Sequence, residues 1–187
     1  MTVTSGLSLD GSTADLASSA DGLRQSYSFV PSAVSALCGH DGQNPRGLVV
    51  ATLQPVSLAP ALLGVLIQST SSTWPVLANL DRIGVSVFSE HQSGYARQLA
   101  SHAPNRFAGV STQQRDTAVF VNDAAAWFEV SPAAVSEAGD HLFVLLEVRS
   151  CHVNEDTDPL VFHRSRFRAV KPWRDNSAYW PLDDVWQ

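Results

Sequence analysis

The stretch Gly47-Leu-Val-Val-Ala-Thr-Leu-Gln-Pro-Val-Ser-Leu-Ala-Pro-Ala-Leu-Leu-Gly-Val-Leu-Ile-Gln-Ser-Thr-Ser-Ser-Thr-Trp-Pro75 is the most informative part of this chain of 187 residues. Two apolar runs within it have the composition of strands, and a polar turn follows each of them. Short polar side chains and free backbone N–H groups at such places can hold a phosphate or the edge of a heterocycle. One Ser there is more often an ordinary turn residue, but two polar turns around one hairpin-like unit favour a binding site. Their side chains are Thr52, Gln54 and Ser57, then Gln68, Ser69, Thr70, Ser71, Ser72 and Thr73.

The whole chain predicts a mainly β protein with a few short helices. Helices are expected at 15–27, from Ser72 or Thr73 with Pro75 in the first turn, and at 90–102. Strands that are short and numerous, with few helices between them, favour an antiparallel barrel or sandwich over a doubly wound parallel sheet. The strands are expected at 33–37, 47–53, 61–67, 83–88, 118–120, 126–130, 141–148 and 161–169.

Several short motifs follow one another in a definite order. They are Thr-x-x-x-Val-Ser-Leu-x-Pro from Thr52, Ser-Ser-Thr-x-Pro from Ser71, Asn-Arg-Phe-Ala-Gly-Val at 105–110, Gly-Asp-His at 139–141 and Pro-Leu-Val-Phe-His-Arg-Ser-Arg-Phe at 159–167. In these motifs the chain resembles the flavin reductase family over residues 27–168. Members of this family are small NAD(P)H-dependent enzymes that supply reduced flavin to two-component monooxygenases. The chain departs from the family in its first loop, which is less rich in serine, and at Ser165, where Gly is common.

The resemblance implies a split β-barrel with Greek-key connections, a homodimer, and flavin at the subunit interface. Residues 15–170 are then the flavin reductase-like domain. Residues 1–14, rich in Ser, Thr and Gly, are expected to form a flexible arm. The segment 171–187 carries several aromatic residues with large apolar surfaces. This tail is therefore expected to pack on the barrel, on the partner subunit or on a ligand.

The resemblance also implies residues at the nicotinamide. It places His141 of the Gly-Asp-His motif beside the nicotinamide amide as the expected catalytic residue, in preference to a role as a turn cap. It places Phe107 in the nicotinamide or flavin pocket. His163 and Phe167, four apart in one expected strand and so on one face, would approach the nicotinamide from its other side.

On the flavin side, the resemblance gives roles to the two polar turns. Arg106 is expected at a phosphate, where a guanidinium forms two parallel hydrogen bonds. The family often has a basic residue where this chain reads Ser101-His102, which leaves phosphate binding to Arg97 or Arg106. Trp74 is expected in the core or an interface. The expected flavin contacts are Ala51, Thr52, Leu53 and Gln54 at the isoalloxazine, Ser57 on the phosphate side, and Ser69, Ser71, Ser72 and Thr73 at the phosphate or ribityl chain.

Composition limits the function classes. Apolar residues make up 44% and charged residues 16%, which is typical of one compact domain. A net charge of −6 argues against binding to duplex nucleic acid. The apolar runs are too short to cross a membrane and the N-terminus does not resemble an export signal, so a cytoplasmic protein is expected. Cys38 and Cys151 fit a reducing compartment as small buried hydrophobes, although their number leaves a disulfide open.

The motifs that are missing also inform the prediction. The sequence has no Gly-x-Gly-x-x-Gly, Walker-type loop, Gly-x-Ser-x-Gly elbow or zinc-ligand spacing, so a Rossmann site, a hydrolase and a bound metal are not expected. Hydride transfer between cofactor rings needs no nucleophile or strong base from the protein. The chain is therefore expected to pass a hydride from NADH, in preference to NADPH, to free FAD or FMN for a partner monooxygenase. A non-catalytic flavin-binding module and an oxidase of the pyridoxamine-phosphate type remain alternatives.

Overall fold

The computed structural model describes residues 19–171. The arm expected at 1–14 lies outside the described residues. Of the tail expected at 171–187, the part from residue 172 on also lies outside them. The mainly β fold with a few short helices is confirmed. The helices are α1 (Ala20–Tyr27), α2 (Trp74–Leu77) and α3 (Ser93–Ala100), with a 3₁₀ turn η2 (Glu90–Gln92). The strands are β1 (Ser32–Ala33), β2 (Ser35–His40), β3 (Pro45–Val50), β4 (Gln54–Leu58), β5 (Ala61–Gln68), β6 (Ile83–Val87), β7 (Thr112–Arg115), β8 (Ala118–Val121), β9 (Ala126–Ala138), β10 (His141–Val153), β11 (Leu160–His163) and β12 (Arg166–Ala169).

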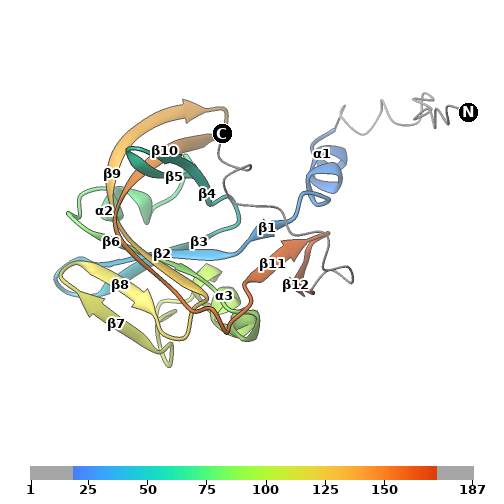
Figure 1. The fold of residues 1–187 in the computed structure, drawn as a ribbon. Helices are drawn as coiled ribbons and strands as arrows, with labels where there is room; N and C mark the ends of the chain where they lie inside the picture. The colour runs from blue at the N-terminus through green and yellow to red at the C-terminus, as the bar shows by residue number, and fades with distance from the viewer. Residues whose placement is uncertain (1–18, 172–187) are drawn as a thin grey trace, which may run out of the picture.

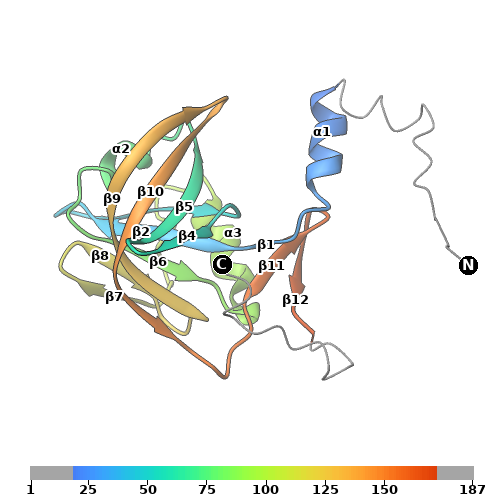
Figure 2. The same cartoon turned by 45° about the horizontal axis from the view of Figure 1, so that its top comes forward.

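Most strands belong to one antiparallel sheet. Its order is β4-β5-β10-β9-β6-β2-β8-β7, with β3 paired to β2. Several neighbours, such as β5 with β10, are distant in sequence, as Greek-key connections require. Figure 1 shows this sheet curling into a partly closed barrel over which the β9–β10 ribbon arches. A smaller sheet, β1-β11-β12, stands beside the barrel together with α1 (Figure 2).

Strand β2 carries buried side chains on both of its faces, and so separates two apolar clusters. Leu37 packs inside the barrel with residues such as Val65. The side chains of Ala36 and Cys38 alternate with that of Leu37 and pack on the other face, with Leu99 of α3. Burying a Leu or Val side chain fully contributes about 1.5–3 kcal/mol. The second cluster therefore fixes α3, and the loop that follows it, against the outside of the barrel.

The strand expected at 161–169 is in fact two strands, and the prediction that His163 and Phe167 share a face is wrong. β11 and β12 form a hairpin around Arg164-Ser165, whose φ values are 52° and 58°. His163 and Phe167 occupy neighbouring rungs of this hairpin and therefore point to opposite faces. Positive φ is unusual for these residue types. A Gly at Ser165, common in the family, would have marked the turn in the sequence.

Other differences from the sequence-based expectation concern polar strands. The first polar turn, from Gln54 onward, is strand β4, paired with β5. Strand β7 was not predicted, because its four residues are polar and exposed at an edge of the sheet. The strands expected at 126–130 and 141–148 continue to Ala138 and Val153, where both are exposed. Strands that are exposed on both faces need no alternation of apolar and polar residues. Because strands are predicted from that alternation, the sequence does not reveal these segments.

The helices largely follow the prediction. Thr73 is the N-cap of α2, Pro75 lies in the first turn, and Trp74 is buried in the core. The helix expected at 90–102 consists of η2 and α3 and ends at Ala100. Within residues 19–171, every helix is too short or too polar to cross a bilayer.

The two cysteines differ. Both are free thiols, but only Cys38 is buried. The prediction that Cys151 is also a buried hydrophobe is wrong, because it lies on the exposed outer half of β10.

Candidate functional site

A cleft of about 880 Å³ opens beside the ends of β3 and β5. Its walls are β3, the 68–73 loop after β5, the C-terminal end of α3 with the 101–107 loop, and the start of β10. These segments are distant in sequence, and the curled sheet brings them together. The expected site residues that line the cleft are Ala51, Thr52, Ser71, Ser72, Thr73, Arg106, Phe107 and His141.

The other expected flavin contacts lie outside the lining of this cleft. Leu53 is buried in the barrel core. Gln54 and Ser57 belong to β4, which pairs with β5. The N–H of Ser69 donates to the carbonyl oxygen of Asp140 at 3.1 Å. This last bond ties the loop after β5 to the β9–β10 turn, so Ser69 supports the position of its neighbours.

His163 and Phe167 belong to the smaller sheet and do not line the cleft. The ring of His163 contacts the ring of Phe29, with centroids 6.4 Å apart. Arg97 lies over Phe167, with its guanidinium carbon 5.0 Å from the ring centroid. Arg97 is thus engaged with an aromatic face outside the cleft lining, and of the two expected phosphate ligands only Arg106 lines the cleft.

Thr52 holds the end of β3 against β5. Its hydroxyl donates to the carbonyl oxygen of Leu66 at 3.0 Å and accepts from the N–H of Leu66 at 3.1 Å. Strand β4 pairs with β5 only as far as Gly64. Beyond that point, the Thr52 hydroxyl takes the place of a strand partner for the N–H and the carbonyl group of Leu66. A hydroxyl has a single proton to donate, and here it is used. Thr52 can therefore offer a ligand a lone pair and its backbone.

Arg106 is fixed between α2 and α3. Its Nη2 donates to Thr73 Oγ1 at 3.0 Å. Its Nη1 lies 3.4 Å and 3.5 Å from the carbonyl oxygens of Leu99 and Ser101, at the C-terminal end of α3, where a positive charge is favourable. Gln98 anchors the loop by donating to the carbonyl oxygen of Arg106 at 2.9 Å. The cleft wall thus holds a partly buried cation in a defined orientation.

Phe107 fits into the wall because Gly47 leaves room for it. A Cβ atom at Gly47 would lie 2.9 Å from Phe107 Cζ and 2.6 Å from Cys38 Sγ, which is closer than side chains pack. Burial raises the pKa of the Cys38 thiol to about 12. The thiol therefore stays protonated and serves as packing beneath the ring.

His141 begins β10 directly after the two-residue turn Gly139-Asp140. Gly139 has a φ of 66°, which glycine adopts readily. Nδ1 of His141 donates to Asp140 Oδ1 at 2.7 Å, and this hydrogen bond, followed by the charge of the imidazole, lowers the pKa of Asp140. His141 pairs with Gln68 across the sheet, at the start of the 68–73 loop. With Nδ1 held by Asp140, Nε2 is the ring nitrogen left for a ligand.

The lining also includes two side chains that can carry a positive charge and were not among the predicted contacts, Arg46 and His102. Nε of Arg46 donates to Asp41 Oδ2 at 2.6 Å. The N–H of Asn44, then the Arg46 guanidinium and the N–H of Gln43, hold the pKa of Asp41 well below its usual range. A single Arg near the start of a strand forms no sequence pattern, so only the structure connects it with the cleft.

The charge of the cleft differs from that of the chain. The described residues that line it include two arginines, two histidines and no carboxylate. Asp41 and Asp140, just outside the lining, pair with Arg46 and His141, whereas Arg106 contacts only neutral acceptors, so the lining keeps a positive charge at Arg106 in a chain whose net charge is −6. Guanidinium and hydroxyl groups suit phosphates, and the apolar surfaces of Phe107 and Leu66 suit a planar ring. This donor set fits phosphorylated cofactors such as flavin and nicotinamide nucleotides.

Comparison with known proteins identifies the family of the chain. The family model for flavin reductase-like domains matches residues 27–171. A flavin reductase of Pseudomonas putida is 29% identical over 139 residues, which cover 73% of this chain and 82% of the relative. The actinorhodin polyketide dimerase of Streptomyces coelicolor is 31% identical over 150 residues, which cover 79% of this chain and 85% of the relative.

Among solved structures, an NADH:FAD oxidoreductase of Streptomyces globisporus, in complex with NAD and FAD fragments, is similar with a TM-score of 0.77. It is 27% identical in sequence, and the match covers 82% of this chain and 94% of that chain. The fold expected from the resemblance is thereby confirmed. Because the family model spans most of the chain, this protein belongs to the family of flavin reductase-like proteins.

Proposed function

We propose that this protein is an NAD(P)H-dependent flavin oxidoreductase that reduces FAD or FMN with NADH and delivers reduced flavin to a partner monooxygenase. The observation that carries the proposal is the positive cleft of a flavin reductase-like chain, with a hydroxyl-bearing loop, an aromatic wall and His141 at its edge. Several relatives bear the names of reductase components of monooxygenases, which supports the delivery step. The two free thiols support a place in the cytoplasm.

The roles of the residues follow from the groups they present. The two substrates supply the hydride chemistry themselves, provided that the reacting atoms are held roughly 3–3.5 Å apart. Arg106 binds a flavin phosphate through the guanidinium nitrogens that face the cleft, with the hydroxyls of Ser71 and Ser72 beside it. The backbone at Ala51 and Thr52 borders the isoalloxazine edge, since the Thr52 hydroxyl is committed to Leu66.

His141 orients the nicotinamide. Its Nδ1 is held by Asp140, so Nε2 remains to form a hydrogen bond with the carboxamide of the nicotinamide. Phe107 provides a flat apolar surface in the same cleft and excludes water from one side of the rings. Neither residue takes part in proton transfer, because hydride transfer to flavin requires the protein only to orient the two substrates.

The proposed preferences are NADH over NADPH and FAD over FMN. Arg46 supports the second preference, because it gives the cleft a second cation, on a different element from Arg106. FAD carries two phosphates and FMN one, so a second guanidinium favours FAD. The arginines at 164, 166 and 168 lie outside the lining of the cleft, and its two arginines stand on different elements, so the described lining has no arginine cluster of the kind that receives the 2′-phosphate of NADPH.

A homodimer that completes the cleft is part of the proposal. Val56 and Leu66 are exposed large apolar residues, with 44% and 37% of their surface accessible. Val56 and Phe143 both approach the same point above Gly64, so these side chains form one apolar patch on the outer face of β4, β5 and β10. Leu66 also lines the cleft. An exposed patch that is continuous with the cleft favours a second copy of the chain as its cover. Light scattering on the purified chain measures the mass: a dimer is expected, and a monomer at micromolar concentration contradicts it.

The test of the main proposal is steady-state oxidation of NADH, followed by its near-ultraviolet absorbance, with FAD or FMN varied. We expect turnover that saturates in both NADH and flavin, and a higher kcat/KM with FAD and with NADH. Adding a flavin-dependent monooxygenase and its substrate should then yield hydroxylated product without direct contact being required. No loss of NADH absorbance with either flavin rejects the reductase and leaves the flavin-binding module.

A second candidate function rests on one relative. The similarity to a protein named as a polyketide dimerase, at 31% identity, favours a reaction in which a polyketide is the substrate. The two candidates differ in what NADH oxidation requires. A reductase consumes NADH with free flavin alone, whereas the second candidate requires an added polyketide for turnover.

A further inference from the structure

A second cleft, of about 500 Å³, opens between the β7–β8 hairpin and the end of the β9–β10 ribbon where β9 begins and β10 ends. It shares no lining residue with the first cleft, and the proposed reaction does not use it. Its lining combines aromatic rings with charged and amide side chains. The residues that determine its chemistry are Gln113, Arg115, Phe120, Trp127, Glu129 and His152.

One side of this cleft is an aromatic wall. Trp127 is fixed, because its Nε1 donates to the carbonyl oxygen of Val121 at 2.8 Å. The ring of His152, directly opposite Trp127 in the β9–β10 ladder, lies 5.4 Å away with an interplanar angle of 33°. The ring of Phe120, on β8, lies 6.1 Å from the ring of Trp127. A wall of ordered rings that is partly open to solvent suits a planar ligand, since little conformational entropy is lost on binding.

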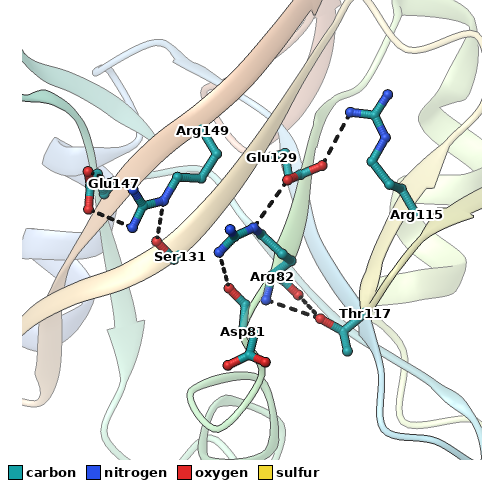
Figure 3. Close-up of polar contacts among 8 residues, drawn as sticks. All are labelled: Asp81, Arg82, Arg115, Thr117, Glu129, Ser131, Glu147 and Arg149. Atoms are coloured by element: carbon teal, nitrogen blue, oxygen red, sulfur yellow. Dashed lines mark hydrogen bonds and ion pairs between the residues drawn. The ribbon is translucent and has the colours of Figure 1, made fainter.

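The charged side of the cleft has a guanidinium with spare donors. Glu129 is shared by two arginines, with Arg82 Nε 3.2 Å from Oε1 and Arg115 Nη1 3.4 Å from Oε2. Figure 3 shows that Arg82 is held further by a bond to the carbonyl oxygen of Asp81, whereas Arg115 makes a single long contact. The side chain of Arg115 is 68% exposed. Most of its five N–H donors therefore point into water or into the cleft.

The spacing of the two sides matches one class of ligand. Trp127 and Glu129 are two residues apart on β9, so they share a face at about 6.6 Å along the strand. Because Arg115 contacts Glu129, its guanidinium is separated from the aromatic wall by about this two-residue spacing. A carboxylate attached to an aromatic ring spans such a spacing, and a guanidinium binds it through two parallel hydrogen bonds.

We propose that this second cleft binds a planar aromatic carboxylate, with the ring against Trp127 and His152 and the carboxylate on Arg115. The amide of Gln113, which lies on the same face of β7 as Arg115, is placed for a polar substituent of the ring. This site is separate from flavin reduction, so the proposal stands or falls independently of the proposed function.

The test uses three probes of similar size and titration calorimetry on the full chain. Benzoate has the plane and the charge, benzamide the plane alone, and cyclohexanecarboxylate the charge alone. We expect benzoate to bind about fivefold more tightly than benzamide, as for one exposed ion pair, and more tightly than cyclohexanecarboxylate. Raising the salt concentration should reduce the first difference. A saturating amount of FMN should leave benzoate binding unchanged.

Two exposed variants locate the site without disturbing the core. Arg115→Gln should abolish the preference for benzoate over benzamide, and His152→Ala should weaken both. Arg149→Gln is the matched control, because Arg149 is an exposed arginine of β10 that pairs with Glu147 outside the cleft lining, and it should change neither. All three variants should keep the NADH oxidation rate. Benzoate that binds equally well to Arg115→Gln, that FMN displaces, or that shows no binding at tens of millimolar overturns the proposal.

Discussion

The two arginines of the main cleft are held in opposite ways. Arg106 is partly buried, has contacts with three acceptors, and sits in a loop anchored by Gln98. Arg46 is exposed and has one charged partner, Asp41, in a surface turn. We call the first region the inner wall, with Arg106 and Phe107, and the second the outer rim, with Asp41 and Arg46. The cleft therefore combines a preorganised inner wall with an adaptable outer rim. Variants of each region should differ in the size of their effect.

The largest effect is expected at the inner wall. Arg106→Ala removes a charged donor from a fixed position, and hydrogen bonds to charged groups contribute about 1.5–3 kcal/mol, so kcat/KM for flavin should fall roughly 10–100-fold. Arg106→Lys keeps the charge without the planar fork and should fall in between. Steady-state kinetics measure both, with Arg149→Ala as a distant control. A change of less than twofold in Arg106→Ala would show that phosphate binding lies elsewhere.

The packing of the inner wall predicts the next effect. Gly47→Ala forces a methyl group against Phe107 and Cys38, and overpacking of this kind costs about 1–3 kcal/mol. We expect a lower thermal midpoint and an increased KM, because the ring of Phe107 must move into the cleft. Gly94→Ala is the matched control: nothing lies within 4 Å of its Cβ position in α3, so it should stabilise slightly. Equal thermal midpoints for the two variants would contradict the account of Phe107.

His141 tests whether orientation by a single contact is enough on the nicotinamide side. His141→Ala should raise the KM for NADH about tenfold, as expected for loss of one or two hydrogen bonds, and leave the KM for flavin within twofold. His91→Ala, which changes an exposed histidine far from the cleft lining, should do neither. Similar changes in both KM values would remove the proposed role.

The pH dependence of the same contact has a definite sign. The pKa of Asp140 is lowered in the folded chain, so its interaction with His141 is complete above the usual range of a carboxyl group. The interaction is lost only as the pH falls through the lowered pKa. Asp140→Asn keeps a side-chain oxygen that can accept from Nδ1 of His141, so steady-state kinetics should show a smaller increase in the KM for NADH than for His141→Ala.

The smallest effect is expected at the outer rim. Exposed ion pairs contribute about 0.2–1 kcal/mol, so Arg46→Ala should raise the KM for FAD by a few-fold at most. FMN, with one phosphate on Arg106, should be affected less. Arg24→Ala, which breaks an exposed pair of α1 with Asp21, is the control. If FMN and FAD respond equally, the rim does not distinguish the flavins.

The candidate site could be predicted in part. The second polar turn was recognised from its hydroxyl residues, and Ser71, Ser72 and Thr73 do line the cleft. The prediction for the first polar turn is less accurate, because Gln54 and Ser57 lie on a polar strand that the sequence does not distinguish from a loop. His163 and Phe167 were placed together by strand periodicity, and a two-residue turn with positive φ separates them. Local patterns in the sequence indicate the secondary structure of a residue. They do not indicate which face of the sheet its side chain occupies.

Apolar alternation and ordered motifs are enough to predict the strand-rich class, the core strands and the family, because both are local properties of the chain. Which residues line the cleft follows only from the three-dimensional fold. Arg46, Thr73 and Arg106 meet there because the sheet curls and the apolar cluster on the outer face of β2 fixes α3 beside β3. Contacts between residues distant in sequence depend on how long-range strand pairing closes, and no local pattern encodes that closure.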